Sequence, residues 1–285
     1  MIIFKKAFDL QRYANDHREK WAGSGFVPTM GALHPGHISL IAEARQHSTL
    51  VIASIFVNPT QFNDPADLEK YPVTTARDIQ MLEMAGCDVL FLPDVPEIYP
   101  FGYEDTRHYA LGELETVLEG KYRPGHFQGV CQVVHILLQK VKPFAIFMGQ
   151  KDLQQCMVIR KLIDLESLPV RLITCSTLRE PDGLAMSSRN VRLNEENRQK
   201  ATSIFKEMEL IKSDLGSMVP AELETRAIRN LLNAGFAKVD YVAIADPTTL
   251  SPLEAWHPGK AAAVLVAAFL GEVRLIDNMV LSTGG

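Results

Sequence analysis

The chain has 285 residues, of which 47% are hydrophobic and 22% charged, and its formal net charge is −5. These values are ordinary for a globular protein and exclude a disordered, collagen-like or fibrous chain. An acidic chain without a run of Lys or Arg is also a poor match for a nucleic-acid backbone. We therefore expect a globular protein whose partners are not nucleic acids.

The cysteines and the apolar segments predict the compartment. Cys87, Cys131, Cys156 and Cys175 are widely spaced and form no CxxC motif, which favours buried free thiols over a structural zinc site. The amino-terminal MIIFKKAFDLQ holds too few apolar residues for a signal peptide. The longest apolar run, Ala261–Leu270, is far shorter than the ~20 residues needed to span a bilayer, and it reads as a buried strand. We expect a cytoplasmic protein with no membrane partner.

Short apolar runs alternate with segments of helical periodicity up to residue 177. The runs predict strands at Gly25–Thr29, Leu50–Val57, Asp88–Pro93, Phe144–Met148 and Val170–Thr174. The periodic segments predict helices at Gly36–Gln46, Val73–Ala85, Phe127–Val141 and Lys151–Asp164. This alternation predicts an α/β domain over residues 1–177, built on a Rossmann-like doubly wound parallel sheet. Ligands should then bind at the carboxyl ends of the strands.

A smaller α+β domain is expected over residues 178–285. The polar loop Arg179–Asn190 opens this part of the chain. Two helices and then three strands should follow, at Asn194–Ser213, Pro220–Asn233, Lys238–Ile244, Ala261–Leu270 and Val273–Val280. We expect this domain to pack beside the first as a lid.

The strongest chemical signal is the HxGH pattern in PTMGALHPGH, residues 28–37, directly after the first predicted strand. Gly31 and Gly36 allow tight turns, and the free N–H groups of the following helix suit a phosphate. His34 and His37 are three residues apart, so both rings can stabilise charge that develops on a phosphate. The alternative is a pair of surface histidines in an ordinary strand–helix loop. The strand–loop–helix context favours a phosphate site.

Two further polar loops follow predicted strands. In GQKDLQQ, residues 149–155, Lys151 offers a point charge for phosphate, and Asp152 is suited to capping a helix or binding a ribose. In FVNPTQF, residues 56–62, Asn58 and Gln61 offer neutral donors and acceptors suited to a hydroxy acid or an amine. Each loop alone has an ordinary structural explanation, as a helix cap or a turn.

A fourth loop, REPDGLAMSSRN at residues 179–190, carries Met186, Ser187, Ser188 and Arg189. Two hydroxyls and a guanidinium fit a polyphosphate, because Arg can hold two phosphate oxygens at once. A solvated linker between domains is the alternative. Four such loops predict one nucleotide-binding function more readily than four coincidences.

The four motifs, in this order, resemble those of the pantothenate synthetase family, whereas HxGH alone marks only the wider nucleotidyltransferase superfamily. The resemblance covers nearly the whole chain from about Phe26. It implies an enzyme that condenses pantoate with β-alanine, using ATP and releasing AMP and diphosphate through a pantoyl-adenylate. It also implies a homodimer that requires Mg²⁺.

The resemblance implies roles for individual residues. It implies that His37 is the catalytic acid-type residue, helped by His34 and Lys151. It implies that Gln61 and Gln155 contact pantoate or β-alanine, and the chemistry of the loop adds Asn58 to that substrate set. The implied ATP-binding residues are Met30, Gly31, Ala32, Leu33, His34, Pro35, Gly36, His37, Gly149, Gln150, Lys151, Asp152, Leu178 through its backbone, Met186, Ser187, Ser188 and Arg189.

The sequence departs from the family at two places. The family usually reads Tyr-Pro-Arg-Thr where this chain has Tyr71-Pro72-Val73-Thr74, and paired acids of some members correspond to Arg77-Asp78. We therefore expect no protein ligand to Mg²⁺ and an ion held by ATP phosphates and water.

Four questions stay open at the level of sequence. A different adenylyl- or cytidylyltransferase would share HxGH, and a nucleotide-sensing or RNA-binding domain would share the fold. Val130, Val133 and Val134 suit either plain core packing or a pantoate pocket, and His126 has no clear role, whereas His135 reads as a core residue. For a dimer, Ala261–Leu270 and the edge of the second predicted strand are candidate contact regions.

Overall fold

The computed structural model describes residues 1–63, 65–103, 107–257 and 259–281. These residues divide into two compact units. The first contains Met1–Gln150 and Gln155–Ser176, and the second contains Lys151–Gln154 and the described residues from Thr177 onward. Among the helices described, none combines the length and the apolar character needed to cross a membrane.

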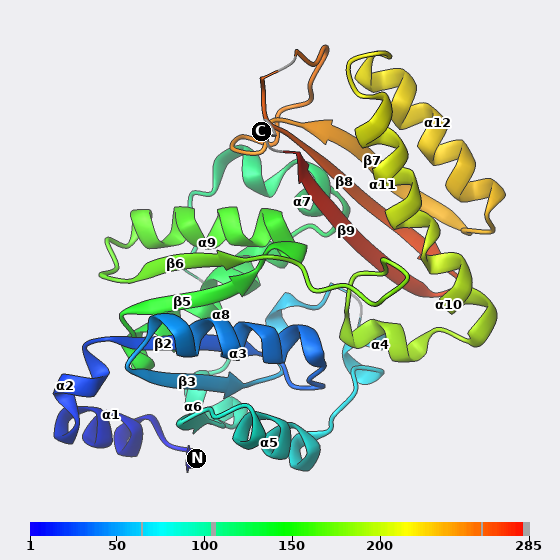
Figure 1. Cartoon of the computed structure of the whole chain (residues 1–285). Coiled ribbons are helices and arrows are strands. Elements are labelled where there is room, and N and C mark those ends of the chain that lie inside the picture. Colours follow the sequence, from blue (N-terminus) through cyan, green and yellow to red (C-terminus); the bar gives the residue numbers. More distant parts are fainter. Residues whose placement is uncertain (64, 104–106, 258, 282–285) are drawn as a thin grey trace. The chain divides into compact units, whose positions relative to one another are not determined.

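The first unit is built on a parallel sheet in the strand order β1-β4-β3-β2-β5-β6 (Figure 1). Strand β2 pairs with β3 on one side and with β5 on the other, so the strand order reverses at β2. This reversal is the switch point at which open α/β sheets bind ligands, beyond the carboxyl ends of the strands. The strands are β1 (Ile2–Phe4), β2 (Ser24–Thr29), β3 (Leu50–Ile55), β4 (Val89–Phe91), β5 (Ala145–Gly149) and β6 (Arg171–Cys175).

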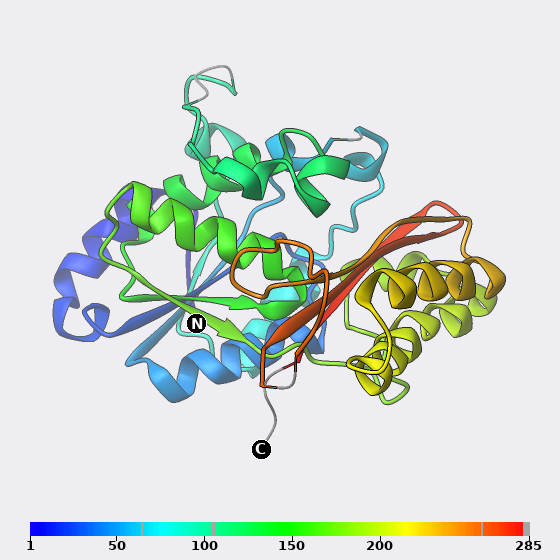
Figure 2. The same ribbon diagram turned by 90° about the horizontal axis from the view of Figure 1, so that it is seen from above.

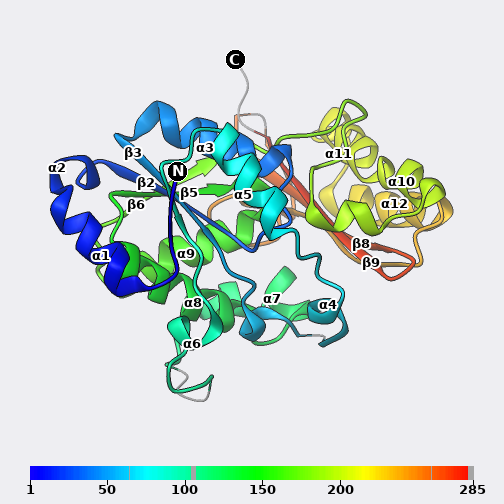
Figure 3. The same ribbon diagram turned by 90° about the horizontal axis from the view of Figure 1, so that it is seen from below.

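Helices cover both faces of this sheet, as the prediction of a doubly wound fold requires. Helices α1 (Ala7–Asp16), α8 (His126–Val141) and α9 (Leu153–Leu165) pack on one face, and α3 (Pro35–His47) and α5 (Thr75–Met84) on the other (Figure 3). The shorter elements are the helices α2 (Arg18–Trp21), α4 (Pro65–Glu69), α6 (Val95–Ile98) and α7 (Leu118–Tyr122), and the 3₁₀ turns Pro59–Gln61, Gly112–Glu115 and Gln150–Asp152.

The strand side chains alternate between the two cores. Phe26 and Ile52 belong to the cluster under α8 and α9, whereas Val27 and Ala53 belong to the cluster under α3. Successive residues of a strand point to opposite faces, so a sheet covered on both sides needs apolar residues at almost every position. This requirement explains why the strands were visible in the sequence as continuous apolar runs.

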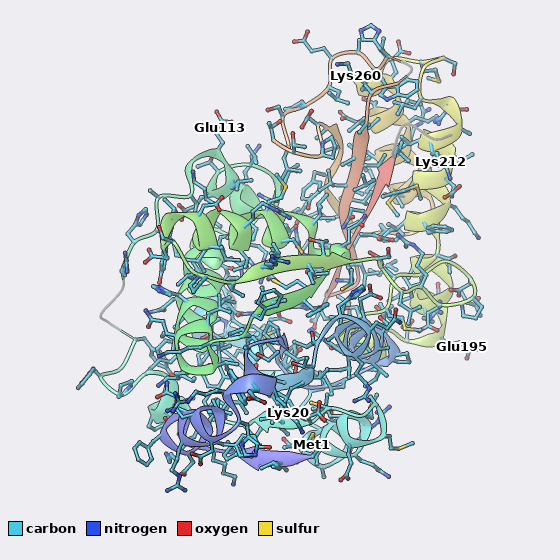
Figure 4. All side chains as sticks on the ribbon, turned by 60° about the vertical axis from the view of Figure 1, so that its left-hand side comes forward. Met1, Lys20, Glu113, Glu195, Lys212 and Lys260 are labelled. Atoms are coloured by element: carbon cyan, nitrogen blue, oxygen red, sulfur yellow. The ribbon has the colours of Figure 1, made fainter. Side chains whose placement is uncertain are left out.

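The second unit is an antiparallel sheet, in the order β7-β8-β9, with helices packed on one face (Figure 2). Charged residues on the outer side of these helices, such as Glu195 and Lys212, point away from the sheet (Figure 4). The elements are α10 (Glu195–Ala201), α11 (Ser203–Asp214), α12 (Pro220–Asn233), β7 (Lys238–Ala245), β8 (Ala262–Leu270) and β9 (Val273–Leu281), preceded by the 3₁₀ turn Ser188–Arg192. The predicted α/β fold with a smaller α+β part is confirmed.

The structure corrects three expectations. The helix predicted at Asn194–Ser213 is two helices, which meet at Thr202, where the hydroxyl donates back to the Gln199 carbonyl. Strand β1, which has only three residues, and helix α1 were not predicted. Strand β8 is the central strand of its sheet and almost wholly buried, so Ala261–Leu270 is no surface for a dimer contact.

The buried polar residues of the first unit follow the sequence reading. All four cysteines are free, and only Cys175 is not fully buried. His135 is buried on α8, where its Nδ1 lies 2.9 Å from the Tyr109 hydroxyl and its Nε2 lies 3.0 Å from Gln139 Nε2. It is a hydrogen-bonded core residue, as predicted.

His135 should make the stability of the fold depend on pH. Burial lowers the pKa of His135, although the Glu166 carboxylate opposes the shift. A lowered pKa means that the unfolded chain binds more protons just below pH 6.5, so the free energy of unfolding should fall as the pH falls through this region. We predict that His135→Gln reduces the loss of stability between pH 7.5 and pH 5.5, measured by urea unfolding at both values. The exposed His108→Gln should retain the loss shown by the parent chain, and an unchanged loss in His135→Gln would contradict the prediction.

Candidate functional site

The loop after β2 carries the HxGH residues in an unusual backbone conformation. Gly31 and Ala32 have φ values of +78° and +49°, both in the left-handed region. A Cβ on Gly31 would approach Asp78 Oδ2 and Ile55 within 3.1 Å, so this position has little room for a side chain as well. Helix α3 then begins at Pro35, which leaves His34 at its N-cap. The loop therefore delivers both histidines to the amino end of a helix, where the helix dipole favours anions.

The two histidine rings lie against each other, with their centroids 4.0 Å apart. The His34 backbone N–H donates to His37 Nδ1 across 3.3 Å. Because Nδ1 accepts this bond, a neutral His37 ring carries its proton on Nε2. His37 can therefore offer an N–H donor from the far side of the ring.

Asp78 on α5 holds this loop in place. Its side chain is buried, with 1% of the residue exposed, and its Oδ2 accepts from the Ala32 N–H at 3.0 Å. Its Oδ1 accepts from the Leu33 N–H at 2.8 Å and from the Thr74 hydroxyl at 3.0 Å. Charged acceptors make the stronger kind of hydrogen bond, and three donors offset the cost of burying the carboxylate. The N–H groups of Ala32 and Leu33 thus donate to Asp78. Contacts of these two residues with a ligand must therefore use other atoms.

Asp78 was missed as a site residue by the sequence reading. The resemblance implied only that Arg77-Asp78 correspond to paired acids of some family members. In the structure Arg77 is exposed and both Asp78 oxygens accept from the loop. The available signal was weak, since an acid in the first turn of a helix is ordinary.

The 3₁₀ turn after β3 brings Gln61 to the HxGH loop. Gln61 Nε2 donates to the Met30 sulfur at 2.9 Å, and Gln61 Oε1 accepts from Asn58 Nδ2 at 3.2 Å. Both residues belong to the first unit, so the structure joins two of the predicted motifs there.

Asn58 lies behind Gln61 and is only 1% exposed. Its Nδ2 also donates to the Gly129 carbonyl at 3.1 Å, and its Oδ1 accepts from the Tyr99 hydroxyl at 2.7 Å. Burial raises the pKa of Tyr99 to about 12, so its hydroxyl keeps the proton that it donates. The structure thus uses the Asn58 amide to orient Gln61 and the turn.

Helix α8 supports the same turn from its other side. His126 Nδ1 donates to the Gln61 carbonyl at 2.7 Å, while His126 Nε2 lies 3.1 Å from the Arg123 guanidinium. A Cβ on Gly129 would lie 2.3 Å from the Thr60 carbonyl oxygen, so only glycine permits this approach. The sequence left His126 open and did not single out Gly129. Val130, Val133 and Val134 pack in the core, which agrees with the simpler of the two readings.

The loop after β5 is shared between the units. Gly149 and Gln150 belong to the first unit, as does the half-buried Gln155, whereas Lys151 and Asp152 belong to the second. Lys151 lies in the 3₁₀ turn, its side chain is 17% exposed, and its Nζ lies 3.9 Å from Asp152 Oδ2. The regular helix begins only at Leu153, two residues later than predicted.

The fourth motif forms a compact loop in the second unit. Arg179 and Ala185 form a β-bridge, and the Met186 N–H donates to the Leu178 carbonyl at 3.1 Å. The Ser187 hydroxyl accepts from the Arg189 N–H at 3.3 Å and caps the turn that follows. Met186, Ser187, Ser188 and Arg189 are all half-buried. The bond from Met186 to Leu178 thus brings the start of the Met186–Arg189 segment beside Leu178.

The side chains that could bind a metal ion were compared among the residues that the structure describes. Within the described ranges, no group of three or more His, Cys, Asp or Glu side chains is arranged to hold one. The oxygens of Asp78 accept from the loop and from Thr74.

Known proteins match the chain over nearly all of its length. A family model described as Pantoate-beta-alanine ligase matches residues 2–280. The pantothenate synthetase of Porphyromonas gingivalis (strain ATCC 33277) is 44% identical over 280 residues, which cover 98% of this chain and 99% of the relative. The chain belongs to the pantoate-beta-alanine ligase family. It is therefore an enzyme, a ligase.

Other relatives of this ligase agree in sequence and structure. The pantothenate synthetase of Thermotoga petrophila is 41% identical, with coverage of 99% of this chain and 100% of the relative. The crystal structure of pantothenate synthetase from Thermus thermophilus matches with a TM-score of 0.89 and 41% identity, over 98% of this chain and 99% of that one. The pantoate-beta-alanine ligase of Francisella tularensis, solved with beta-gamma ATP and beta-alanine, matches with a TM-score of 0.82 and 36% identity, over 98% and 97%.

The ligase should lose stability when Asp78 loses one acceptor. In Asp78→Asn, one of the loop amides or the Thr74 hydroxyl would face an NH₂ group, because an amide nitrogen cannot accept a hydrogen bond. We expect a destabilisation of about 1–3 kcal/mol in urea unfolding, the cost of a buried donor without a partner. We also expect faster hydrogen exchange in residues 28–37. Glu83→Gln on the exposed side of the same helix is the control and should change neither quantity. Unchanged exchange in Asp78→Asn would show that the carboxylate does not hold the loop.

Proposed function

We propose that this ligase joins pantoate to β-alanine with ATP, through a pantoyl-adenylate, and releases AMP and diphosphate. The observation that carries the proposal is the contact between two loops of the first unit, at the switch point of the sheet. There His37 offers a donor at the amino end of α3, and Gln61 contacts Met30 of the same loop. The relative from Francisella tularensis, solved with beta-gamma ATP and beta-alanine, supports the choice of substrates.

The residue roles are proposed from the motifs. His37 acts on the developing charge, with His34 and Lys151. Gln61 and Gln155 contact pantoate and then β-alanine, and Asn58 serves the same substrates through Gln61. The proposed ATP contacts are Met30, Gly31, Ala32, Leu33, His34, Pro35, Gly36, His37, Gly149, Gln150, Lys151, Asp152, Leu178, Met186, Ser187, Ser188 and Arg189.

The reaction needs no nucleophile from the protein. A pantoate carboxylate oxygen attacks the α-phosphorus of ATP in line, and the bond from that phosphorus to diphosphate breaks. The amine of β-alanine then attacks the acyl carbon, AMP leaves with the electron pair of the acyl–oxygen bond, and the amine loses a proton. Positioning and charge stabilisation are therefore the tasks of the protein. The Nε2–H of His37, the ammonium of Lys151 and the guanidinium of Arg189 are the groups suited to them.

We propose that Mg²⁺ reaches the enzyme bound to the phosphates of ATP and to water. The engaged oxygens of Asp78 support this reading, because the aligned acid is turned to the loop. The ion supplies charge neutralisation for the phosphates when it is bound.

The assembly and the location of the enzyme are also proposals. We propose a homodimer in the cytoplasm, where four free cysteines suit the reducing conditions. We propose that residues 1–177 bind ATP and pantoate and that residues 178–285 act as the lid domain. A lid has a chemical purpose, since a mixed anhydride such as pantoyl-adenylate hydrolyses in water.

The reaction can be tested by leaving out each substrate in turn. We expect mass spectrometry to detect pantothenate, AMP and diphosphate only with ATP, pantoate and β-alanine together. Without β-alanine, diphosphate and enzyme-bound pantoyl-adenylate should form, and AMP should accumulate much more slowly. AMP release that is independent of β-alanine would favour another nucleotidyltransferase, and ATP binding without diphosphate release would favour a nucleotide sensor.

Removal of one charge-stabilising group should slow adenylation. We predict that His37→Ala and Lys151→Ala each lower the rate of diphosphate release by at least ~10²-fold, as expected for loss of one preorganised donor. Lys212→Ala, at an exposed lysine of α11, is the control and should keep the parent rate. A folded Lys151→Ala variant with the parent rate would overturn the role of Lys151.

A further inference from the structure

Strand β9 places two polar side chains in a buried setting. Asp277 and Asn278 are adjacent, and 5% and 3% of their surfaces are exposed. Adjacent residues of a strand point to opposite faces, so Asp277 shares the face of Val273 and Leu275, which belong to the apolar core. Asn278 points the other way. Buried polar groups are costly unless they are hydrogen-bonded, so both residues need partners.

Asn278 has its partner at Lys151. The Asn278 Nδ2 donates to the Lys151 carbonyl oxygen at 2.8 Å, although 127 positions separate the two residues in the chain. Both lie in the second unit, which includes the short segment Lys151–Gln154. The bond therefore ties the backbone that carries the Lys151 side chain to strand β9.

Asp277 has its partner at Arg179, the first residue of the loop that carries Met186–Arg189. The guanidinium donates to Asp277 Oδ2 at 2.6 Å and to Oδ1 at 3.0 Å, a two-point contact that fixes its orientation. The same guanidinium donates to the Asn278 carbonyl at 3.1 Å and to the Gly183 carbonyl at 3.0 Å. Arg179 thus binds the loop and the Asn278 backbone at once.

We propose that Asn278 is a positioning residue for Lys151, and that β9 fixes the positions of Lys151 and the Met186–Arg189 loop relative to each other. This inference rests on the proposed function, which gives both segments to the ATP phosphates. A lysine ammonium ends a flexible four-carbon chain, so a fixed backbone limits where the charge can lie. A displacement of about 1 Å at a reacting group can cost ~10²-fold in rate, which makes such an anchor consequential.

The test is a double-mutant cycle between the two residues. Asn278→Ala should lower kcat for diphosphate release by ~10- to 10²-fold, with little change in KM for pantoate. In the Lys151→Ala background the same substitution should cost almost nothing more, because its effect acts through Lys151. Asn278→Ser keeps a polar group that cannot reach the Lys151 carbonyl. It should therefore lower kcat as Asn278→Ala does, and cost almost nothing more in the Lys151→Ala background. Full additivity, or a folded Asn278→Ala with the parent kcat, would overturn the proposal.

The control lies on the same sheet. Asp240 on β7 accepts from Arg274 Nε on β9 at 2.8 Å and pairs with Lys238 on its own strand, so Asp240→Asn disturbs the sheet while leaving the bond from Asn278 to Lys151 in place. It should leave kcat near the parent value. If Asn278→Ala and Asp240→Asn lower kcat equally at equal loss of stability, Asn278 has only a structural role.

A second measurement does not depend on activity. Hydrogen exchange of the peptide covering residues 149–155 should be faster in Asn278→Ala and unchanged in Asp240→Asn. If the parent enzyme releases no diphosphate from ATP and pantoate, the proposed function fails, while faster exchange would still support the anchor. Unchanged exchange in Asn278→Ala would overturn the anchor whatever the activity.

Discussion

A buried carboxylate holds the loop that carries the HxGH residues. The Ala32 and Leu33 amides converge on Asp78 because Gly31 and Ala32 adopt left-handed backbone conformations. Such conformations are unfavourable for a residue with a side chain, and they persist only where surrounding contacts hold them. The charge of Asp78 supplies these contacts. Met30, whose sulfur Gln61 contacts, directly precedes Gly31. The two histidines and the start of α3 follow Leu33 directly.

The loops of the first unit that we propose to bind substrates are therefore held by buried groups. Asp78 supports the loop after β2, and Asn58, His126 and Gly129 support the turn after β3. The second unit repeats this pattern, since Asn278 and Arg179 support segments that carry Lys151 and Ser187. In each case a buried polar or small residue fixes the backbone. The side chain proposed for the reaction is then limited to a few positions.

Much of the fold was predictable from sequence because its causes are local. Strands such as β3 are buried on both faces and so read as apolar runs, and α12 was predicted with its observed bounds because its apolar periodicity is clear. The motif loops were predictable because they follow such strands. Strand β1, with three residues, was not predictable, because its position depends on pairing with β4, which lies far along the chain.

The supporting residues of the site were not predictable for the same reason. Asp78, Gly129 and Asn278 each act on a segment that is distant in sequence. An acid in a first helical turn, a glycine inside a helix and an asparagine in a strand are each common in proteins. Their roles depend on a partner that only the fold brings into contact, and a single sequence does not show that partner. The motif residues differ because the residues next to them in sequence already indicate a loop at the end of a strand.

The close approach of Gly129 to Thr60 also limits how this sequence can change. Any side chain at position 129 would occupy the space of the Thr60 carbonyl, so a replacement there requires the turn to move. Gln61 ends this turn, its carbonyl accepts from His126 on α8, and its side-chain oxygen accepts from Asn58. A substitution at position 129 of α8 thus affects a turn that lies much earlier in the chain. Glycine to alanine is a mild change in most helices, but at this position it forces the turn to move.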